Sequence, residues 1–510
     1  MAKAHKTPGV YVEEISAFPN SVVQVETAIP AFVGYTEKAV YSKKDLALKP
    51  TRVSSLGEFL LYFGGAPKTT YSIENARQQD PNKPYKIKPH GNRYLLFYSM
   101  KLFFANGGSD CFIVSVGDYN DAITQSCLTQ GIQTLDQERE PTMLVIPDAV
   151  LLEQQECYAL QQTMLSHCGS LRDRITILDI FDGFKERTTG DDVITAFRTG
   201  IGSEHLQWGA AYYPWVETNI VGADEVDPPP IEKGSMIAFI GLLKEDIELQ
   251  LKAGLLKQSQ ADDINAVIER LRPTKVSHTE KAGKEDKSKP PSKEEIHQTL
   301  LATHPLYKEI MQSVRAHLSL LPPSGGMAGI YSMVDHTIGV WQSPANVSMS
   351  SVVKPAVNIT SYEQEDLNVS LDGKAVNAIR TFPGKGVLVW GARTLDGNSG
   401  EWRYISVRRT ATFIEQSVKF AAEAFVFEPN DSNTWTSLNA MIRNFLTNIW
   451  REGALAGPTP EHAFFVNIGL GTTMTPADIS EGWMKINIGV AVTRPTEFMV
   501  ITLQQRMQPA

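Results

Sequence analysis

The sequence predicts a multidomain protein of mixed α/β and α+β type. Its 510 residues exceed the usual size of one domain, so two to four domains are expected. In the first half of the chain, short apolar runs that suit buried strands alternate with segments of helical periodicity, which indicates α/β units. The last part of the chain carries two amphipathic helices followed by alternating strand patterns, which is typical of an α+β domain.

The composition limits the classes of function. Hydrophobic residues make up 42% and charged residues 21%, the balance of a globular protein. The net charge of −9 argues against a general nucleic-acid binder, so we expect no nucleic-acid contact. The N-terminal segment lacks the apolar core of a signal peptide, and no apolar window is long enough to span a membrane. The four cysteines form no C-x-x-C pair and are interpreted as reduced thiols, so assembly in the cytoplasm is expected.

The first elements are expected to be strands. β-forming residues at 10–12 follow a Thr-Pro-Gly breaker, and a second short strand is predicted at 22–25. The apolar run 31–35 predicts a buried strand. A helical face over 94–103 ends at Gly107 and Gly108, because glycine accepts the left-handed conformation at a helix C-terminus. Further α/β units are predicted from strands at 111–116, 143–146, 175–180 and 210–215, and from a helix at 150–168.

The stretch 273–295 has a different composition. Val276 and Ala282 are its only aliphatic residues apart from prolines, and it carries six lysines and five acidic residues. Such a segment cannot offset its ordering entropy by burial, which predicts a disordered, solvent-facing loop.

The C-terminal part is the most regular. Strands are predicted at 386–390 and 402–408, joined as a hairpin around Asp396-Gly397. Two helices are predicted at 412–428, with Thr412 and Glu415 as a capping box, and at 434–451. Alternation over 484–492 predicts a half-buried strand, and 498–503 reads as a final apolar strand.

The search for catalytic chemistry gives only weak signals. Gly469-Leu470-Gly471 lacks the third glycine of a dinucleotide fingerprint, and no Walker-type phosphate loop is present in the sequence. His167 lies next to Cys168, but no further ligand stands at metal spacing. We therefore expect no catalytic residues, no metal and no cofactor, while a soluble α/β enzyme or ligand-binding protein stays open as the alternative.

Several short strings occur along the chain in a characteristic order. They are Pro8–Glu14, Ala31–Gly34, Phe104–Gly108, Tyr212–Trp215, Pro322–Gly325, Gly339–Trp341, Pro344–Asn346, Gly386–Thr394 and Trp402–Arg409. Together these strings resemble one family, the tail sheath proteins of contractile phage tails and phage-tail-like contractile injection systems. The resemblance is poorest at 36–90 and 217–320, where this chain is expanded. Phage tail and bacterial injection particle are both left open.

The resemblance implies a structural polymer and a domain plan. Residues 1–30 would form an N-terminal arm that pairs with the C-terminal domain or with neighbours. Residues 31–340 would form outer α/β domains that carry the loop at 273–295, and residues 341–510 a conserved inner sheath domain that ends in a donated strand at 497–505. The sheath would polymerise helically around an inner tube and contract to drive that tube through a target membrane.

The resemblance also implies sites and partners. Candidate arm residues between subunits are Val10, Tyr11, Val12, Glu13, Phe498, Met499, Val500, Ile501 and Leu503. Pairing of these arms within their own chain is the alternative. Arg443 and Arg451 fall off the apolar stripe of their helix and are candidate contacts to the tube, with plain solvation as the alternative. The implied partners are other copies or paralogous sheath subunits, the inner tube protein, baseplate and terminal cap proteins, and a disassembly ATPase.

Overall fold

The computed structural model describes residues 22–78, 83–91, 93–188, 190–222, 225, 230–272 and 292–498. Contacts divide this part of the chain into two compact units. The larger unit contains residues 27–338 and 343–408, and the smaller unit contains residues 22–26, 339–342 and 409–498. The prediction of a mixed α/β multidomain protein is confirmed.

A nine-stranded sheet forms the centre of the larger unit. Its inner strands are parallel because helices connect them, and they are buried on both faces, as their continuous apolar runs require. Antiparallel strands extend the sheet at both edges. In spatial order the strands are β13 (Val347–Ser348), β16 (Gly386–Trp390), β15 (Asn377–Phe382), β10 (Gly209–Tyr213), β9 (Ile175–Asp179), β8 (Met143–Val145), β1 (Pro30–Thr36), β7 (Cys111–Asp118) and β4 (Thr51–Val53).

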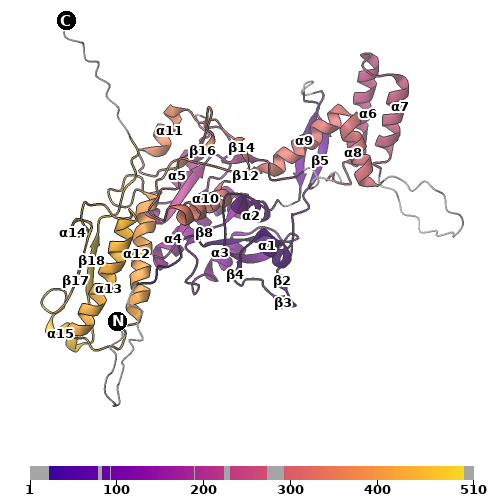
Figure 1. Ribbon diagram of the computed structural model, residues 1–510. Helices are drawn as coiled ribbons and strands as arrows, with labels where there is room; N and C mark the ends of the chain where they lie inside the picture. Colours follow the sequence, from indigo (N-terminus) through magenta and orange to yellow (C-terminus); the bar gives the residue numbers. More distant parts are fainter. Residues whose placement is uncertain are drawn as a thin grey trace, which may run out of the picture. The chain divides into compact units, whose positions relative to one another are not determined.

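Helices and short strands complete this part of the larger unit (Figure 1). The helices are α1 (Leu56–Phe63), α2 (Leu96–Ala105), α3 (Gln125–Gln133), α4 (Gln154–Leu171), α5 (Val193–Gly200), α10 (Ser324–Thr337) and α11 (Ser361–Asn368), with 3-10 turns η1 (Pro147–Leu151) and η2 (Leu206–Trp208). A hairpin joins β2 (Val40–Tyr41) to β3 (Lys44–Asp45), and a small sheet contains β12 (Leu320–Leu321), β11 (Val216–Thr218) and β14 (Val352–Pro355).

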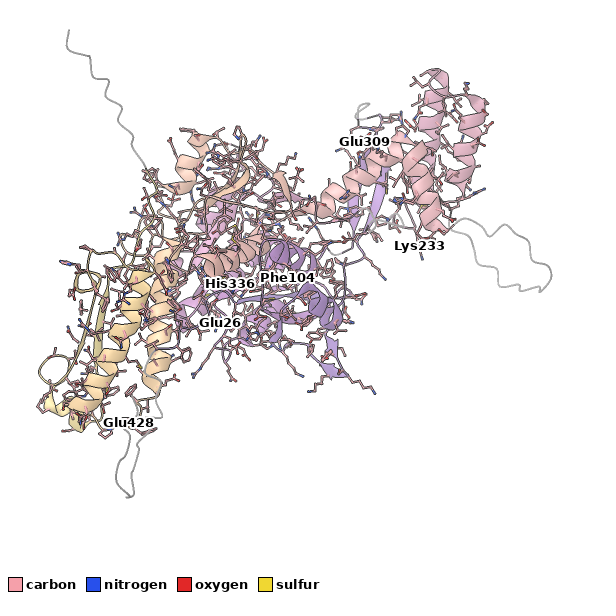
Figure 2. The ribbon with its side chains drawn as sticks, in the orientation of Figure 1. Glu26, Phe104, Lys233, Glu309, His336 and Glu428 are labelled. Carbon is pink, nitrogen blue, oxygen red and sulfur yellow. The ribbon has the colours of Figure 1, made fainter. Side chains whose placement is uncertain are left out.

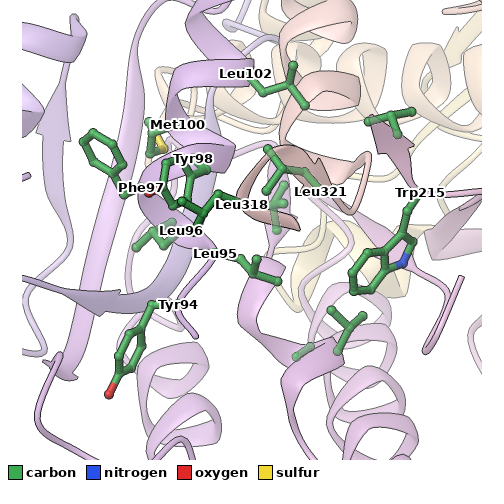
Figure 3. Packing of buried hydrophobic residues seen from close by; sticks show 14 of the residues in the cluster. Tyr94, Leu95, Leu96, Phe97, Tyr98, Met100, Leu102, Trp215, Leu318 and Leu321 are labelled. Atoms are coloured by element: carbon green, nitrogen blue, oxygen red, sulfur yellow. The ribbon is translucent and has the colours of Figure 1, made fainter. Parts of the chain in front are cut away.

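A second hairpin and four helices form a further group within the larger unit. The hairpin strands are β5 (Thr70–Asn75) and β6 (Tyr85–His90), and the helices are α6 (Met236–Lys252), α7 (Gln258–Glu269), α8 (Lys293–Thr303) and α9 (Pro305–Ser319). Successive helices pack on each other, and α6 and α9 pack on the hairpin. Buried apolar side chains continue from the end of this group into the sheet region, where Leu318 and Leu321 lie near α2 and Trp215 (Figure 3).

The smaller unit has two long helices and one small sheet (Figure 1). Its helices are α12 (Ile405–Glu423), α13 (Ser432–Arg451), α14 (Pro460–Ala463) and α15 (Pro476–Ser480), and its strands are β17 (Phe464–Ile468) and β18 (Ile486–Val490). Residues 405–408 of α12 belong to the larger unit. The core of the smaller unit is formed by the apolar faces of α12 and α13, the inward residues of β17, and Val22 and Val340.

Most of the predicted elements are confirmed, and three local predictions are wrong. Residues 402–408 do not form a strand, because β16 pairs with the preceding strand β15 and Ile405 already begins α12. Thr412 and Glu415 therefore lie inside a helix and cannot cap its start. No strand is assigned at 22–25.

The structure describes only the end of the predicted loop, and it divides the chain at a different residue from the predicted boundary. The loop lies mostly outside the described residues, but its end is helical, since Ser292 and Glu295 form the capping box of α8. The boundary predicted at residue 341 differs from the observed division at residue 409, because the β15–β16 hairpin joins β10 and so extends the large sheet.

Helices α2 and α10 pack with almost no space between their backbones. A β-carbon at Gly325 would meet the backbone of Ser99, and one at Gly329 would overlap the carbonyl oxygen of Phe103. Glycine at these positions therefore sets the separation of the two helices, and through them the thickness of the layer over the sheet.

Two buried carboxylates hold the starts of these helices. Asp179, at the end of β9, accepts hydrogen bonds from the backbone N–H and the hydroxyl of Ser324 at 2.9 and 2.5 Å. Asp148 accepts from the backbone N–H groups of Tyr35 and Leu95 at 3.1 and 2.6 Å. Burial raises the pKa of Asp148 to about 6 and that of Asp179 to about 7, although these hydrogen bonds act in the opposite direction.

We expect Gly329→Ala to destabilise the larger unit by about 1–3 kcal/mol, because the new methyl group forces α2 and α10 apart. The matched control is Gly241→Ala in α6, where a β-carbon meets nothing within 4 Å. That control should be neutral or stabilising by up to about 1 kcal/mol, since alanine favours a helix. Thermal unfolding followed by circular dichroism measures both, and equal midpoints for the two variants would contradict the prediction.

We expect Asp179→Asn to make stability less dependent on pH. The pKa of Asp179 is raised in the folded protein, so its contribution to stability is complete below about pH 4 and is lost as pH rises through about 7. Asparagine cannot titrate, so the difference between the native protein and the variant should change in favour of the variant between pH 5 and pH 8. Unfolding midpoints at both pH values measure this, with exposed Asp372→Asn as the control. A constant difference would show that Asp179 does not titrate in this range.

Candidate functional site

The sheet of the smaller unit consists of two antiparallel strands, β17 and β18. Phe464 and Val466 are buried beneath the sheet, in the core that it shares with α13. The side-chain amide of Asn439 on α13 donates to the Val466 carbonyl at 3.1 Å, which ties the strand to the helix. On the other face, the ring of Phe465 covers Gly489 of the opposite strand, where a larger residue would leave no room for the ring. The hairpin is therefore held in place from both sides.

The connection between these strands is ordered by local polar contacts. Thr475 and Asp478 form the capping box of α15, and Lys485 donates to Asp478 at 2.5 Å. These hydrogen bonds, first that of Lys485, lower the pKa of Asp478 to about 2. The ends of β17 and β18 are thus fixed although their connection is exposed.

The β17–β18 sheet leaves one edge of each strand without a strand neighbour among the described residues. Neither strand carries a charged residue or a proline. Lysine and proline are the residues that proteins place on an edge strand to prevent pairing with another chain. This sheet therefore has the chemistry of an edge that accepts a further strand.

Several other sheet edges in the described part of the chain are protected. β6 carries Lys86, Lys88 and Pro89, and the outer edge of β5 is hydrogen-bonded by the segment that contains Pro230 and Glu232. The edge strands of the nine-stranded sheet have only two and three residues. Protection elsewhere makes the open β17–β18 sheet a specific feature of the smaller unit.

The structure places the predicted tube-contact residues on this unit. Arg443 and Arg451 are both exposed on α13, away from its buried face. The Arg443 guanidinium lies 5.9 Å from the ring of Phe464, so the start of β17 holds its side chain. Arg451 is the last residue of the helix.

The predicted arm residues lie almost wholly beyond the described chain. Val10 to Glu13 and Met499 to Leu503 are outside the described residues, and Phe498 is 71% exposed. The described chain begins at Val22, which is buried in the core of the smaller unit, and the Val25 N–H donates to the Ser417 hydroxyl at 3.2 Å. Residues that precede the larger unit in the sequence thus pack with residues that follow it, and both belong to the smaller unit.

Parallel sheets usually bind ligands at one particular place. That place is the carboxyl end of the strands, where Asp148 and Asp179 lie. Both carboxylates are fully engaged with backbone groups and a serine of the chain itself. Within the same described residues, no group of three His, Cys, Asp or Glu side chains could hold a metal ion, and no helix is both long and apolar enough for a membrane span.

His167 and Cys168 are both buried, and their surroundings explain their pKa values. The imidazole Nδ1 of His167 lies 3.1 Å from Asp136, and burial, reinforced by Arg174, lowers the pKa of His167. Burial raises the pKa of the Cys168 thiol to about 12, which makes it a poor nucleophile.

The sequence analysis missed the strand β17 and the two buried aspartates. Phe464, Val466 and Ile468 alternate with Phe465 and Asn467, a short pattern between Pro460 and Gly469 that could have indicated a strand. Asp179 is the last residue of β9 and Asp148 follows β8 by three positions, and that placement after apolar runs could have indicated side chains at the carboxyl end of a parallel sheet.

Comparisons with known proteins give matches to sheath proteins. Residues 398–506 match the family described as phage tail sheath C-terminal domain. The tail sheath protein of Burkholderia phage BcepMu is 28% identical over 148 residues, which are 27% of this chain and 30% of that protein. The aligned part thus spans less than a third of this curated relative's length.

Solved structures extend the similarity along the chain. A chain from the baseplate of the anti-feeding prophage is 25% identical, with a TM-score of 0.59 over 99% of this chain and 100% of that one. A chain from the helical sheath of the same system in its contracted state has a TM-score of 0.61 at 24% identity, over 99% of this chain and all of that one. These matches confirm the resemblance to the tail sheath family, by sequence in residues 398–506 and by fold along almost the whole chain.

Proposed function

We propose that this protein is the structural subunit of a contractile sheath, which polymerises helically around an inner tube and contracts to drive the tube through a target membrane. The observation that carries the proposal is the open β17–β18 sheet, which lies within the residues that match the phage tail sheath C-terminal domain. An open sheet of this kind is completed when a neighbouring subunit adds a strand. The matches give no support to the alternative function as an enzyme or ligand-binding protein.

Strand addition explains how subunits stay linked while they move. Backbone hydrogen bonds supply the binding energy, and alternate side chains enter pockets on the accepting sheet. The donors are the segments Val10–Glu13 and Phe498–Leu503, both rich in β-forming residues. The chain that joins each arm to its own subunit would absorb rotation, so that the links persist through contraction.

Contraction needs no nucleotide if the extended state is metastable. Each further 100 Å² of apolar surface buried per subunit supplies about 2.5 kcal/mol before costs. Summed over many subunits that release is large enough for mechanical work. The protein itself then acts as a structural element with no catalytic residues, no metal and no cofactor.

The proposed partners follow from this role. They are other sheath copies or paralogous subunits, the inner tube protein, baseplate and terminal cap proteins, and a disassembly ATPase. A baseplate and a helical sheath are named for the structurally similar chains, which supports other sheath copies and the baseplate as partners. Assembly in the cytoplasm into a phage tail or a tail-like particle completes the proposal.

Proline at Val500 should block tube formation, because it removes one backbone donor that a strand ladder needs and keeps the other apolar residues of the arm. The matched control is Val500→Thr, which keeps the backbone N–H and a β-branched side chain. Removal of 499–510, or of 1–19, should have the same effect as the proline and leave a folded monomer, because the helices and strands that form the two cores come from other parts of the sequence. Circular dichroism, size-exclusion chromatography and negative-stain microscopy report fold, size and tubes.

Normal contractile tubes from the deleted protein would contradict strand donation. Unfolded monomers would instead mean that each arm belongs to the core of its own chain.

Reversal of charge at Arg443 and Arg451 together should impair co-assembly with the inner tube while the unfolding midpoint changes little, because both side chains are exposed and the lost contact of Arg443 with Phe464 is worth about 1 kcal/mol or less. Lys308→Glu on α9, also exposed, is the control in the larger unit. Co-sedimentation of sheath with tube measures the effect. Unchanged co-sedimentation of the double variant would leave these arginines as ordinary solvated residues.

A further inference from the structure

Helix α9 connects a group of helices to the sheet region of the larger unit (Figure 1). We call β5, β6 and α6–α9 together the helical group. Within this group α9 packs on α6, α8 and β6, and it also packs on β11 and β12 beside the sheet. Figure 2 labels Glu309 on this helix. A histidine lies at each end of α9, His304 at its start and His317 in its last turn, so both imidazoles bear on how the group is held.

The imidazole of His304 caps the start of α9 and is almost fully buried. Its Nδ1 accepts a hydrogen bond from the Tyr307 backbone N–H at 3.3 Å, and its Nε2 lies 3.2 Å from the Leu243 carbonyl oxygen of α6. A backbone N–H can only donate and a carbonyl oxygen can only accept, so Nδ1 is unprotonated and Nε2 carries the hydrogen. A further proton would bind to Nδ1, where it would face the Tyr307 N–H and the positive end of the helix. The cap therefore requires the neutral imidazole.

The groups that face His304 from other helices keep it neutral. The carboxylate of Asp246 on α6 lies 4.0 Å from Nδ1, but the Arg77 guanidinium lies 3.5 Å from the same carboxylate and balances its charge. On α8, the His297 imidazole is 2.6 Å from the Tyr307 hydroxyl. Burial of His304 outweighs the attraction of Asp246 and lowers the pKa of His304 below its ordinary value.

His317 lies beside a buried cation at the other end of α9. Its Nδ1 is 2.9 Å from the hydroxyl of Tyr71, a fully buried residue of β5. The Arg93 guanidinium, from the segment before α2, donates to the backbone carbonyls of His317 and Leu320. Tyr98 of α2 lies near Arg93 and stays neutral, because burial raises its pKa to about 12. Burial, reinforced by the charge of Arg93, lowers the pKa of His317 to about 4.

The end of α9 is attached to the sheet region by side chains that donate to backbone carbonyls. Arg315 donates to the Val221 carbonyl at 2.7 Å, and the hydroxyl of Thr218 on β11 donates to the Ser319 carbonyl at 2.8 Å. His317 belongs to the same turn as these contacts. A change in its charge therefore acts at the place where the helical group joins the sheet.

We propose that the helical group is an acid-sensitive element, which opens as the pH falls from 7 to 5 while the nine-stranded sheet and the smaller unit stay folded. The start of α9 needs a neutral imidazole as its cap, and its end needs a neutral imidazole beside a buried arginine. In the opened group both imidazoles are in water, where they bind a proton with the ordinary affinity of histidine. Acid therefore favours the opened form. The inference is independent of the proposed function, because it concerns a single subunit.

The helical group and the sheet respond to acid in opposite directions. The pKa of His317 is lowered in the folded protein, so its contribution to stability is complete above about pH 6.5 and is lost as the pH falls toward about 4. The pKa values of Asp148 and Asp179 are raised to about 6 and about 7, so their contribution is lost only as the pH rises through these values. Acid thus weakens the helical group under conditions that stabilise the sheet, and such cooperative groups can open by themselves.

Hydrogen–deuterium exchange of the unassembled full chain at pH 7 and pH 5 tests where opening occurs. After correction for the intrinsic exchange rate, the amides of α6, α8 and α9 should be about 20-fold less protected at pH 5, from the change at His317 alone. The amides of β1, β9 and α13 should keep their protection. Mass spectrometry of peptic peptides measures each segment separately.

Replacement of both histidines tests the cause. In His304→Asn and His317→Asn together, each amide oxygen takes about the position of Nδ1, and asparagine caps a helix well but binds no proton in this range. The double variant should therefore show the same protection of α6, α8 and α9 at both pH values. His462→Asn is the control, because His462 is exposed in the smaller unit, and this variant should keep the native response.

Three results would overturn the inference. The first is unchanged protection of α6, α8 and α9 in the native protein at pH 5. The second is an equal loss of protection in the sheet, which would mean that acid unfolds the larger unit as a whole. The third is a double variant that opens at pH 5 as much as the native protein. If the double variant does not fold, His317→Asn alone takes its place and should lose most of the response.

Discussion

The smaller unit contains a sheet of only two described strands, and the open edges of this sheet are the feature on which its proposed role depends. Two strands alone are marginal in water, and each has an edge of backbone donors and acceptors that only another strand can satisfy regularly. In the smaller unit, β17 and β18 are supported by α13 and by the Phe465 ring over Gly489, so the sheet keeps its form without a third strand. A preformed acceptor costs little ordering entropy when it binds, and that favours addition of a strand from a neighbour.

The larger unit is closely packed around its sheet. Its parallel sheet is buried on both faces, and α2 and α10 approach so closely that Gly329 has no room for a β-carbon. Asp148 and Asp179 use buried carboxylates to hold the starts of these helices. A buried ionisable group is costly unless its hydrogen bonds are satisfied, and here the chain satisfies them itself. These two carboxylates at the carboxyl end of the sheet therefore have a structural role.

The sequence was sufficient to predict the elements with long, regular patterns and insufficient for those defined by pairing. Apolar runs such as 31–35 and the stripe of Leu438, Ile442 and Phe445 predicted β1 and α13 because burial alone determines them. The strand predicted at 402–408 was wrong because Gly386–Trp390 has two possible neighbours, and local pattern cannot show that it pairs with β15. The open edge of β17–β18 also could not be predicted from the sequence, because an edge is defined by the absence of a neighbouring strand. The tube contacts and the donated arms remain predictions for the same reason, because both depend on a partner.

Two kinds of contact between copies would have different roles in a sheath that changes shape. Strand addition depends on backbone hydrogen bonds, which are largely independent of side-chain identity and are lost only together, so it suits links that must persist. Charged borders around apolar residues contribute little per exposed ion pair and are screened by salt, so they suit contacts that break and re-form. The β17–β18 strands carry no charges, which suits the proposed addition of a strand. In the proposed sheath, links of this kind would hold neighbouring subunits together while their side-chain contacts change during contraction.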